Sequence, residues 1–550
     1  MPARVRPALS EAGHPKPRGG RSVRRLALVA VAGWALAAAA PTPAVARPAD
    51  AAYGNAKRSA PELPLGRPSL RETRVSRVLA PGVVHTRIVR GEASKKDAWV
   101  VDVAFLPTRA AARQLERRLA ADAVNARTER IAERAQDDPE RGPLGYLVRA
   151  GRFATEAEAV AERTRLTAAG YSGLRVVFTG EDGGRTTGPW VVNVLEVDPV
   201  GYAGTVAPAL ATEVVPGRET LSALAARRGA LGSLNGGYFV IGAANGTDGD
   251  LAGSSLLGGE LVSEAVDGRT SLVLPDFSGA GAFVSTLSDR LTVTAADGAR
   301  RELDGLNRAP GLIRGCGGSG GDVPTERPKH DFTCTDESEL IRYTSIFGAT
   351  TPSGPGAEAV LDAAGDVLEL RETRGGPVPA GGSVLAGTGD AAAWLRAHAF
   401  SGARVTTAAE LLTESGAFVP GPQAGVVNGG PRLARGGLTD IPAFAEGFHW
   451  PENPEFFYRF GLRRNPRTMA GVTADGRLLL VTVDGRAPGH SVGASFEESA
   501  GIMRALGAAD AVNLDGGGST AMTVGRALVT RPSDPTGERP IADALVLTGG

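Results

Sequence analysis

The segment A-V-N-L-D-G-G-G-S-T-A-M, Ala511 to Met522, guides the interpretation of this chain, because an apolar run ends there on a carboxylate, three glycines and two hydroxyls. Gly516 to Gly518 remove every side chain that would separate a ligand from the backbone. A tight turn that needs glycine only for its dihedral angles is the alternative. The polar residues beside the glycines, Asn513 and Asp515, favour a functional strand end.

Other segments of the chain share this design, in which a short apolar run closes on a polar residue and glycine. They are Asn235-Gly236-Gly237 after Leu231 to Leu234, Asn428-Gly429-Gly430 after Val426-Val427, and Asp484-Gly485-Arg486 after Leu478 to Val483. So many strand ends of one design are hard to explain as independent turns, so we expect them to meet in one pocket. Nearby, Arg467 in N-P-R-T offers a guanidinium, which can grip a phosphate in a forked contact, although a surface position is the commoner fate of an arginine.

These segments resemble the phosphodiester glycosidase family. The match runs from about Trp190 to Leu547. Its motifs are N-G-G-Y-F at Asn235, G-V-V-N-G-G-P-R-L at Gly425, P-R-T at Pro466, V-D-G-R at Val483, N-L-D-G-G-G-S-T at Asn513, and P-S-D with G-E-R-P at Pro532 to Pro540. The resemblance implies hydrolysis of a sugar, such as N-acetylglucosamine, that is linked through its anomeric carbon to a phosphodiester.

The implied reaction assigns roles to the residues. Glycosidic cleavage normally needs two carboxyl groups, but a phosphate leaves already charged, so cations and dipoles can replace much of the acid's work. We expect the nucleophile or base among Asp515, Asp484 and Glu498, although Glu498 also suits the dipole of a predicted helix. His490 is a further candidate acid or base, unless it is merely exposed. The expected substrate-binding residues are Asn235, Gly236, Asn428, Arg467, Asn513, Gly516, Gly517, Ser519, Thr520 and Arg539.

Two features bear on metals and disulfides. The loop A-N-G-T-D-G-D, with Asn245, Asp248 and Asp250, offers oxygen ligands together with Asp515 that suit calcium or magnesium, and an acidic surface loop is the alternative. The expected chemistry itself requires no cofactor. Cys316 and Cys334 are the only cysteines, and in an exported protein they predict one disulfide. A zinc site with His330 would need further ligands.

Residues 1–46 read as a secretory signal peptide, with a basic start, an apolar stretch from Leu26 to Ala40 and the small residues Ala44-Val45-Ala46. Arg24-Arg25 could mark the twin-arginine route, and an uncleaved anchor is an alternative. No later run is apolar enough to predict a membrane span. Without the seven basic and one acidic residues of this segment, the 60 basic and 60 acidic residues become 53 and 59, a net charge of −6. Such a protein has no overall field that favours nucleic acid or an anionic membrane.

Residues 47–95 are rich in Ala, Pro and Arg, lack sustained periodicity and predict a linker. Residues 96–182 then repeat a strand followed by an amphipathic helix. They resemble the SPOR-type domain, a βαββαβ unit that binds peptidoglycan glycan strands, through Tyr146, Gly151, Phe153, Ala159, Leu166, Gly170 and Tyr171. The resemblance implies a glycan-binding face on its sheet. A small α+β spacer is the alternative.

Residues 188–550 predict one large domain. With 75 glycines, 37 prolines and 5% aromatic residues, the chain favours many turns between short strands. Helices are expected only at Thr220 to Arg228, Ala391 to His398 and Phe496 to Leu506. We therefore expect an α+β protein with a β-rich, mixed-sheet catalytic domain after the small domain. The predicted function is a secreted, wall-associated hydrolase that cuts sugar-1-phosphodiesters in wall or capsular glycopolymers. A non-catalytic glycan-binding protein and a phosphodiesterase that attacks phosphorus are the alternatives.

Overall fold

The computed structural model describes residues 61–266, 268–311, 313–314, 333–334, 336–449 and 453–549. All of them belong to one compact unit, Lys57–Gly550. The expected signal peptide and the first part of the expected linker lie outside the described residues. The expected pairing of Cys316 with Cys334 does too, since only the backbone of Cys334 is described.

The central sheet has the strand order β1-β2-β7-β28-β27-β29-β25-β26. Its strands are β1 (Glu72–Ala80), β2 (Val83–Arg90), β7 (Trp190–Val197), β25 (Arg432–Arg435), β26 (Leu438–Thr439), β27 (Arg467–Thr473), β28 (Leu478–Val483) and β29 (Ala508–Asn513). β27 is antiparallel to both of its neighbours, so β28 and β29 run in the same direction. The ends of β28 and β29 therefore lie at the sheet edge where β27 begins.

The first strands of this sheet correct the expected linker over residues 47–95. β1 and β2 form an antiparallel hairpin, and β2 pairs along its whole length with β7. The turn between them needs Gly82, whose φ is 76°. Val83 and Ile88 of β2 are fully buried, whereas β1 carries only exposed and half-buried side chains. The sequence gives no clear signal for this hairpin, because an edge strand that buries so little has no strong apolar alternation.

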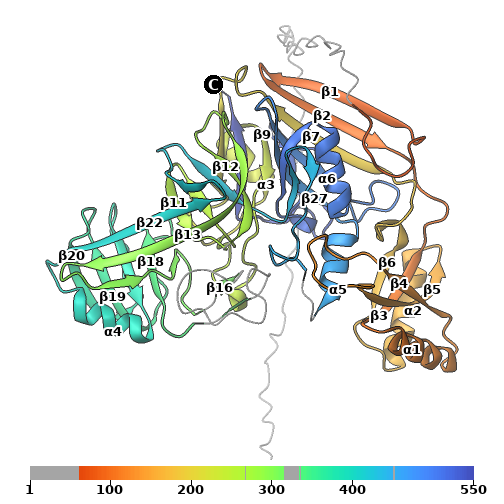
Figure 1. Ribbon diagram of the computed structural model, residues 1–550, viewed down its shortest axis with the longest axis horizontal. Coiled ribbons are helices and arrows are strands. Elements are labelled where there is room, and N and C mark those ends of the chain that lie inside the picture. The colour runs from red at the N-terminus through yellow and green to blue at the C-terminus, as the bar shows by residue number, and fades with distance from the viewer. Residues whose placement is uncertain are drawn as a thin grey trace, which may run out of the picture. The chain divides into compact units, whose positions relative to one another are not determined.

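The small domain follows this hairpin in the chain (Figure 1). Its elements are β3 (Trp99–Leu106), α1 (Arg109–Ala121), β4 (Ala126–Ile131), β5 (Gly145–Phe153), α2 (Glu156–Ala168) and β6 (Arg175–Phe178). The strands form an antiparallel sheet in the order β4-β5-β3-β6. The helices pack on the strands, and Ala112 and Leu119 of α1 and Ala159 and Leu166 of α2 enter the same apolar cluster as Val148 of β5.

Three larger sheets and one two-stranded sheet complete the β-rich part of the described chain, and the β-rich class expected from the sequence is confirmed. One sheet, in the order β31-β30-β9-β32-β8, contains β8 (Thr205–Leu210), β9 (Ala230–Asn235), β30 (Met522–Val524), β31 (Ala527–Leu528) and β32 (Asp543–Thr548). Another contains β10 (Ser255–Leu257), β11 (Glu260–Ser263), β12 (Arg269–Leu274), β13 (Phe283–Ala295), β14 (Arg300–Glu302), β22 (Val405–Thr413), β23 (Gly416–Phe418) and β24 (Gly425–Asn428). The third contains β15 (Gly305–Leu306), β18 (Leu340–Thr344), β19 (Gly354–Leu361), β20 (Val367–Arg374) and β21 (Ser383–Gly387), and β16 (Ile313–Arg314) pairs with β17 (Thr333–Cys334).

The helices of this part are few and short. They are α3 (Leu221–Arg228), α4 (Gly389–His398), α5 (Pro454–Phe457) and α6 (Phe496–Ala505), with a π-helical turn at Tyr458–Leu462 and 3₁₀ turns at Thr179–Glu181, Ala243–Asn245 and Gly517–Ser519. Helix α6 packs on β25, β27 and β29 of the central sheet, and Figure 1 shows it beside β27. Its Ile502 and Met503 are fully buried. Among the described helices, none has the length and apolar character that crossing a bilayer requires.

Candidate active site

The site lies where the ends of strands from different sheets meet. At the edge of the central sheet, Arg467 pairs with Val483, which precedes Asp484, and Met469 pairs with Asn513. From the neighbouring sheet, Asn235 ends β9 and pairs with Ala544 of β32. The glycine segment after Asn513 therefore faces the end of β9.

The side chain of Asn235 joins the two sheets. Its Nδ2 donates to the backbone carbonyl of Asp515 over 2.8 Å, and its Oδ1 accepts from Thr468 Oγ1 at 2.7 Å and from Ala521 N at 3.1 Å. Asn235 is 1% exposed. Because each donor and acceptor of the amide is used within the fold, Asn235 positions the Asp515 segment.

The sheet that contains β24 is joined through Tyr238. The side-chain Oδ1 of Asn428, at the end of β24, accepts from Tyr238 N at 2.9 Å. The Tyr238 hydroxyl donates to Gly430 O over 2.8 Å and accepts from Asn513 Nδ2 at 2.9 Å. The polar strand ends identified from the sequence therefore do converge, and much of their hydrogen bonding holds the wall of the site together.

The glycine segment forms a loop around which two guanidiniums gather. Gly517 has a φ of 61°, which an L side chain rarely adopts, and its N–H donates to Pro466 O over 2.9 Å. A Cβ at Gly517 would lie 3.3 Å from a terminal nitrogen of Arg486, and one at Gly518 would lie 2.2 Å from Arg539 Nη2. The absence of side chains at these positions thus lets the arginines approach the backbone.

The two arginines that border this loop, Arg486 and Arg539, have different hydrogen-bond partners. Arg539 forms an ion pair with Asp534 at 2.8 Å, and its Nη1 lies 3.5 Å from Ser519 Oγ. Arg486 is exposed, and its Nη2 donates to Asn465 Oδ1 over 2.9 Å. Its φ of 53° places a non-glycine residue in the left-handed region, where backbone strain commonly marks a functional position.

Two carboxyl groups lie on either side of the N-G-G turn. Asp543, 4% exposed at the start of β32, accepts from Gly237 N at 3.0 Å. A Cβ at Gly236 would lie 2.4 Å from its carboxyl group, so glycine is required there. Burial, with a smaller contribution from the charge of Asp515, raises the pKa of Asp543 to about 7. The half-buried Asp515 thus lies close enough to Asp543 for its charge to be felt there, and the Asp543 carboxyl group is mostly neutral below about that pH.

Asp484 is 2% exposed at the end of β28, and both of its carboxylate oxygens are engaged. Oδ2 lies 2.8 Å from Nε2 of His490, and Oδ1 accepts from Arg531 N at 3.2 Å. The imidazole of His490 is partly exposed, with 27% of its side chain accessible. A buried carboxylate that orients an accessible imidazole is an arrangement suited to proton transfer.

Arg467 lies beneath the site. It is 1% exposed, its Nε donates to Ala494 O over 2.9 Å, and its guanidinium lies 4.5 Å from the ring centre of Phe496 and 5.4 Å from that of Phe460. Burial lowers its pKa to about 10. With these contacts, Arg467 is better placed to support the loop that carries Asn465 and Pro466 than to contact a phosphate directly.

Glu498 has two structural partners. It completes a capping box with Ser495 at the start of α6, and its carboxylate binds Arg464 through both oxygens at 2.7–3.0 Å. Arg464 is 3% exposed. The capping role considered from the sequence accounts for the contact with Ser495, and the ion pair with Arg464 is a further structural contact.

The acidic loop considered for metal binding has protein partners. Asp248 pairs with Arg218 at 3.1 Å and accepts from Gly242 N at 2.7 Å. Asp250 is buried, and burial followed by the charge of Glu264 raises its pKa well above the usual value. Within the described part of the chain, no group of three or more His, Cys, Asp or Glu residues is arranged to hold a metal ion.

Some residues of the site were not singled out from the sequence. They are Tyr238, Thr468, Arg486, Asp534 and Asp543. Tyr238, Thr468, Arg486 and Asp534 lie within the motifs quoted above, so their presence was visible although their roles were not. For Asp543 the only signal was a charge at the head of the apolar run Ala544 to Leu547.

Two family models match parts of the chain. The model of the phosphodiester glycosidase family matches residues 355–548, and the SPOR domain model matches residues 95–176. The first match includes the Asn428, Asp484 and Asp515 segments, whereas Asn235 lies outside it. A search of curated proteins found no match.

Three solved structures align with most of the chain, with very different degrees of similarity. A protein of Burkholderia pseudomallei K96243 assigned as exported is 36% identical, with a TM-score of 0.81 over 88% of this chain and 98% of that one. A Synechocystis protein of unassigned function is 18% identical, with a TM-score of 0.51 over 87% of this chain and 79% of that one. The zebrafish N-acetylglucosamine-1-phosphodiester alpha-N-acetylglucosaminidase catalytic domain is 13% identical, with a TM-score of 0.31 over 78% and 91% of the chains. The chain therefore carries a phosphodiester glycosidase domain over residues 355–548 and, on its N-terminal side, a SPOR domain over residues 95–176.

Proposed function

We propose that this protein hydrolyses the bond between the anomeric carbon of a sugar and the phosphate of a sugar-1-phosphodiester, such as an N-acetylglucosamine-1-phosphodiester. The supporting observation is the loop that starts at Asp515, because Arg486 and Arg539 both border its glycines. Phosphate oxygens placed beside this loop would meet two cations and backbone dipoles, while the sugar would lie toward Asp515.

The proposed reaction uses the arginines in place of a strong general acid. Water oxygen forms a bond to the anomeric carbon as the bond from that carbon to the phosphate oxygen breaks, and the electron pair leaves with the phosphate. Arg486 and Arg539 stabilise the departing phosphomonoester, whose charge increases in this step. The water proton passes to a base, for which Asp515 is the candidate and His490, oriented by Asp484, the alternative.

Asp543 has a supporting role in this proposal. While its carboxyl group is neutral, Asp543 adds no negative charge beside Asp515. Ionised Asp543 would repel the phosphate. The proposed chemistry needs no cofactor, and calcium or magnesium would enter it only if activity required added metal.

The SPOR domain and the phosphodiester glycosidase domain support a setting for this activity. We propose that the protein is exported and bound to peptidoglycan glycan strands, and that its substrates are wall or capsular glycopolymers. The similarity to a protein assigned as exported supports export, and the SPOR match supports wall binding.

Hydrolysis in water labelled with heavy oxygen tests the reaction. The methyl phosphodiester of N-acetylglucosamine 1-phosphate is incubated with the purified mature chain and with its Asp515→Asn variant. We expect label in the released sugar, none in the phosphate, and loss of product in the variant. Label in the phosphate would assign a phosphodiesterase instead, and binding without product across a panel of sugar-1-phosphodiesters would assign a glycan-binding protein.

A further inference from the structure

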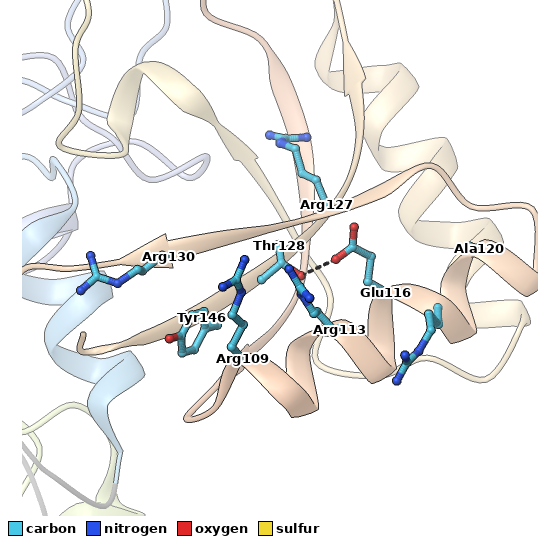
Figure 2. Close-up of a pocket in the computed structure, with 9 residues that line it drawn as sticks. Arg109, Arg113, Glu116, Ala120, Arg127, Thr128, Arg130 and Tyr146 are labelled. Carbon is cyan, nitrogen blue, oxygen red and sulfur yellow. Dashed lines mark hydrogen bonds between the residues drawn. The ribbon is translucent and has the colours of Figure 1, made fainter. Parts of the chain in front are cut away.

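A cleft lies in the SPOR domain, between α1 and the strands β4 and β5, and has a volume of about 830 Å³. None of its lining residues belongs to the candidate active site. Its polar lining consists largely of arginines, which are Arg109, Arg113, Arg117, Arg127 and Arg130. Figure 2 shows Arg109 and Arg113 rising from α1 beside Tyr146 and Thr128.

The positive charge of the cleft is poorly compensated. Arg127 pairs with Glu129 at 2.7 Å, but no described carboxylate forms an ion pair with the other four arginines, which are exposed. The single acid in the lining, Glu116, accepts from Thr128 Oγ1 at 2.7 Å (Figure 2). Some arginines elsewhere in the same domain are paired, as Arg165 is with Glu162 at 2.7 Å and Arg149 is with Asp102 at 2.8 Å.

Helix α1 places its arginines against its own electrostatic preference. Arg109, Arg113 and Arg117 follow each other at intervals of four residues, so they form a row with a spacing of about 6 Å on one face. Like charges at this interval repel each other. Arg109 is also the first helical residue, where the helix dipole disfavours a cation, and the first turn contains no acid.

Helix α2 of the same domain follows the opposite pattern. Its first turn carries Glu156 and Glu158, its last turn carries Arg165, and a capping box closes its start. The two helices have the same length and lie in the same small domain. A helix of this domain can therefore form without a row of arginines. The charge of α1 is better explained by a ligand than by the stability of the helix.

We propose that this arginine cleft binds the phosphate groups of a sugar-phosphate polymer. Guanidiniums bind phosphate through paired N–H donors, and a row of them suits a chain with an anion on each repeat. An uncharged glycan strand offers nothing that needs this row. Nucleic acid is disfavoured because Tyr146 is the one aromatic residue in the described lining, whereas single strands are held by successive stacking platforms. The identity of the polymer rests on the proposed function, since the catalytic loop would cut the same linkage.

Binding of the mature chain to defined polymers tests the cleft. The probe is poly(N-acetylglucosamine 1-phosphate), measured in an Asp515→Asn background so that it stays intact, and the uncharged comparison is a chitin oligosaccharide of similar length. The cleft variant is Arg113→Gln with Arg117→Gln. The matched control is Arg163→Gln, which removes an exposed arginine of α2 outside the cleft. Thermal unfolding checks that all variants fold.

We expect the cleft variant to bind the phosphate polymer about tenfold more weakly or worse, with a flatter salt dependence. The control variant should bind it normally, and chitin oligosaccharide binding should be the same in all three proteins. Unchanged polymer affinity in the cleft variant would overturn the proposal. An equal loss of chitin oligosaccharide binding in the cleft variant would also overturn it. A third contrary result would be that single-stranded DNA or phosphatidylglycerol vesicles bind through the cleft more tightly than the phosphate polymer does.

Hydrolysis separates this proposal from the proposed function. With Asp515 intact, the cleft variant should cleave the small methyl phosphodiester as the wild type does, and only the KM for the polymer should rise. If no protein cleaves either substrate but polymer binding still depends on Arg113 and Arg117, the proposed function fails and the cleft assignment stands.

Discussion

The side-chain amide of Asn235 donates to the backbone carbonyl of Asp515 over 2.8 Å, although 280 positions separate the two residues in the chain. The same side chain accepts from Thr468 and Ala521. One amide therefore sets the position of the candidate catalytic segment relative to two sheets. This explains why the N-G-G and N-L-D-G-G-G motifs belong to a single site.

Replacement of Asn235 by Ala should reduce both stability and activity. It removes the partner of the buried Ala521 N–H and of the Asp515 carbonyl and leaves the Thr468 hydroxyl only its 3.4 Å bond to Thr520, which should lower the free energy of unfolding by about 3 kcal/mol. Urea unfolding and kcat for a sugar-1-phosphodiester measure the two effects. The control is Ser233→Ala on the same strand, which removes a bond to Thr523 away from the Asp515 loop. The control should lose stability but keep kcat, and a full kcat in Asn235→Ala would contradict the positioning role.

The pH dependence should reflect Asp543. Its pKa is about 7 in the folded chain and near 3.8 when unfolded. Because the folded value is raised, the fold holds this proton more tightly, so the associated stability is complete below about pH 4 and is lost as the pH rises toward 7 and above. Activity should fall over the upper part of this range, since ionised Asp543 adds charge beside Asp515.

Asp543→Asn separates this effect from other titrations. The amide oxygen can still accept from Gly237 N, but it carries no charge at any pH. We expect the decline in kcat/KM near pH 7 to disappear in the variant and the stability to become less dependent on pH. A profile that superimposes on that of the wild type would exclude Asp543 as the group responsible.

Arg486→Gly should uncouple stability from activity. Glycine adopts the φ of 53° without strain, so the free energy of unfolding should stay within about 1 kcal/mol of the wild-type value. Loss of the guanidinium beside Gly517 should lower kcat/KM by about 100-fold, since one donor to the departing charge is gone. Arg526→Ala, in the exposed turn after β30, is the control and should change neither quantity. Comparable activity in Arg486→Gly would remove Arg486 from the phosphate contacts.

Local signals in the sequence predicted a large part of the fold. The run Leu478 to Val483 coincides with β28, because an unbroken apolar strand needs burial on both faces. The predicted helix at Thr220 to Arg228 corresponds to α3, where Thr220 caps the start and Gly229 takes a left-handed conformation at the end. Strand ends with glycine likewise indicated the site.

The remainder depends on contacts between distant parts of the chain. The neutral state of Asp543 arises from burial between strands and from Asp515, and neither is visible in the run that follows it. Arg467 was a candidate for phosphate binding, yet the rings of Phe460 and Phe496 enclose it. The motif alone does not show whether the guanidinium of Arg467 points toward the site or packs against aromatic rings.

Glu498→Gln should distinguish a structural from a catalytic carboxylate. The variant keeps an acceptor for the capping box but removes the charge that faces the buried Arg464. We expect a loss of about 2–4 kcal/mol in unfolding free energy, because a buried cation loses its partner. At a temperature where the variant is folded, kcat should stay within about threefold of the wild-type value, which corresponds to well under 1 kcal/mol in the barrier. A stable variant without activity would instead make Glu498 part of the chemistry.

Gly518→Ala should displace the guanidinium of Arg539 without removing any ionisable group from the chain. The new Cβ would lie 2.2 Å from Arg539 Nη2 and 2.3 Å from Asp534 Oδ2, so this ion pair must move away from the loop. The pair is partly exposed, with side chains 28% and 22% accessible, so it can shift into solvent at a cost in stability of about 1 kcal/mol or less. If Arg539 holds the departing phosphate, kcat/KM should fall about 100-fold. Gly525→Ala, at a positive φ in a hairpin turn with open space around it, controls for the general strain of alanine at glycine positions. Equal activity in both variants would show that the reaction does not depend on the contact between Arg539 and the loop.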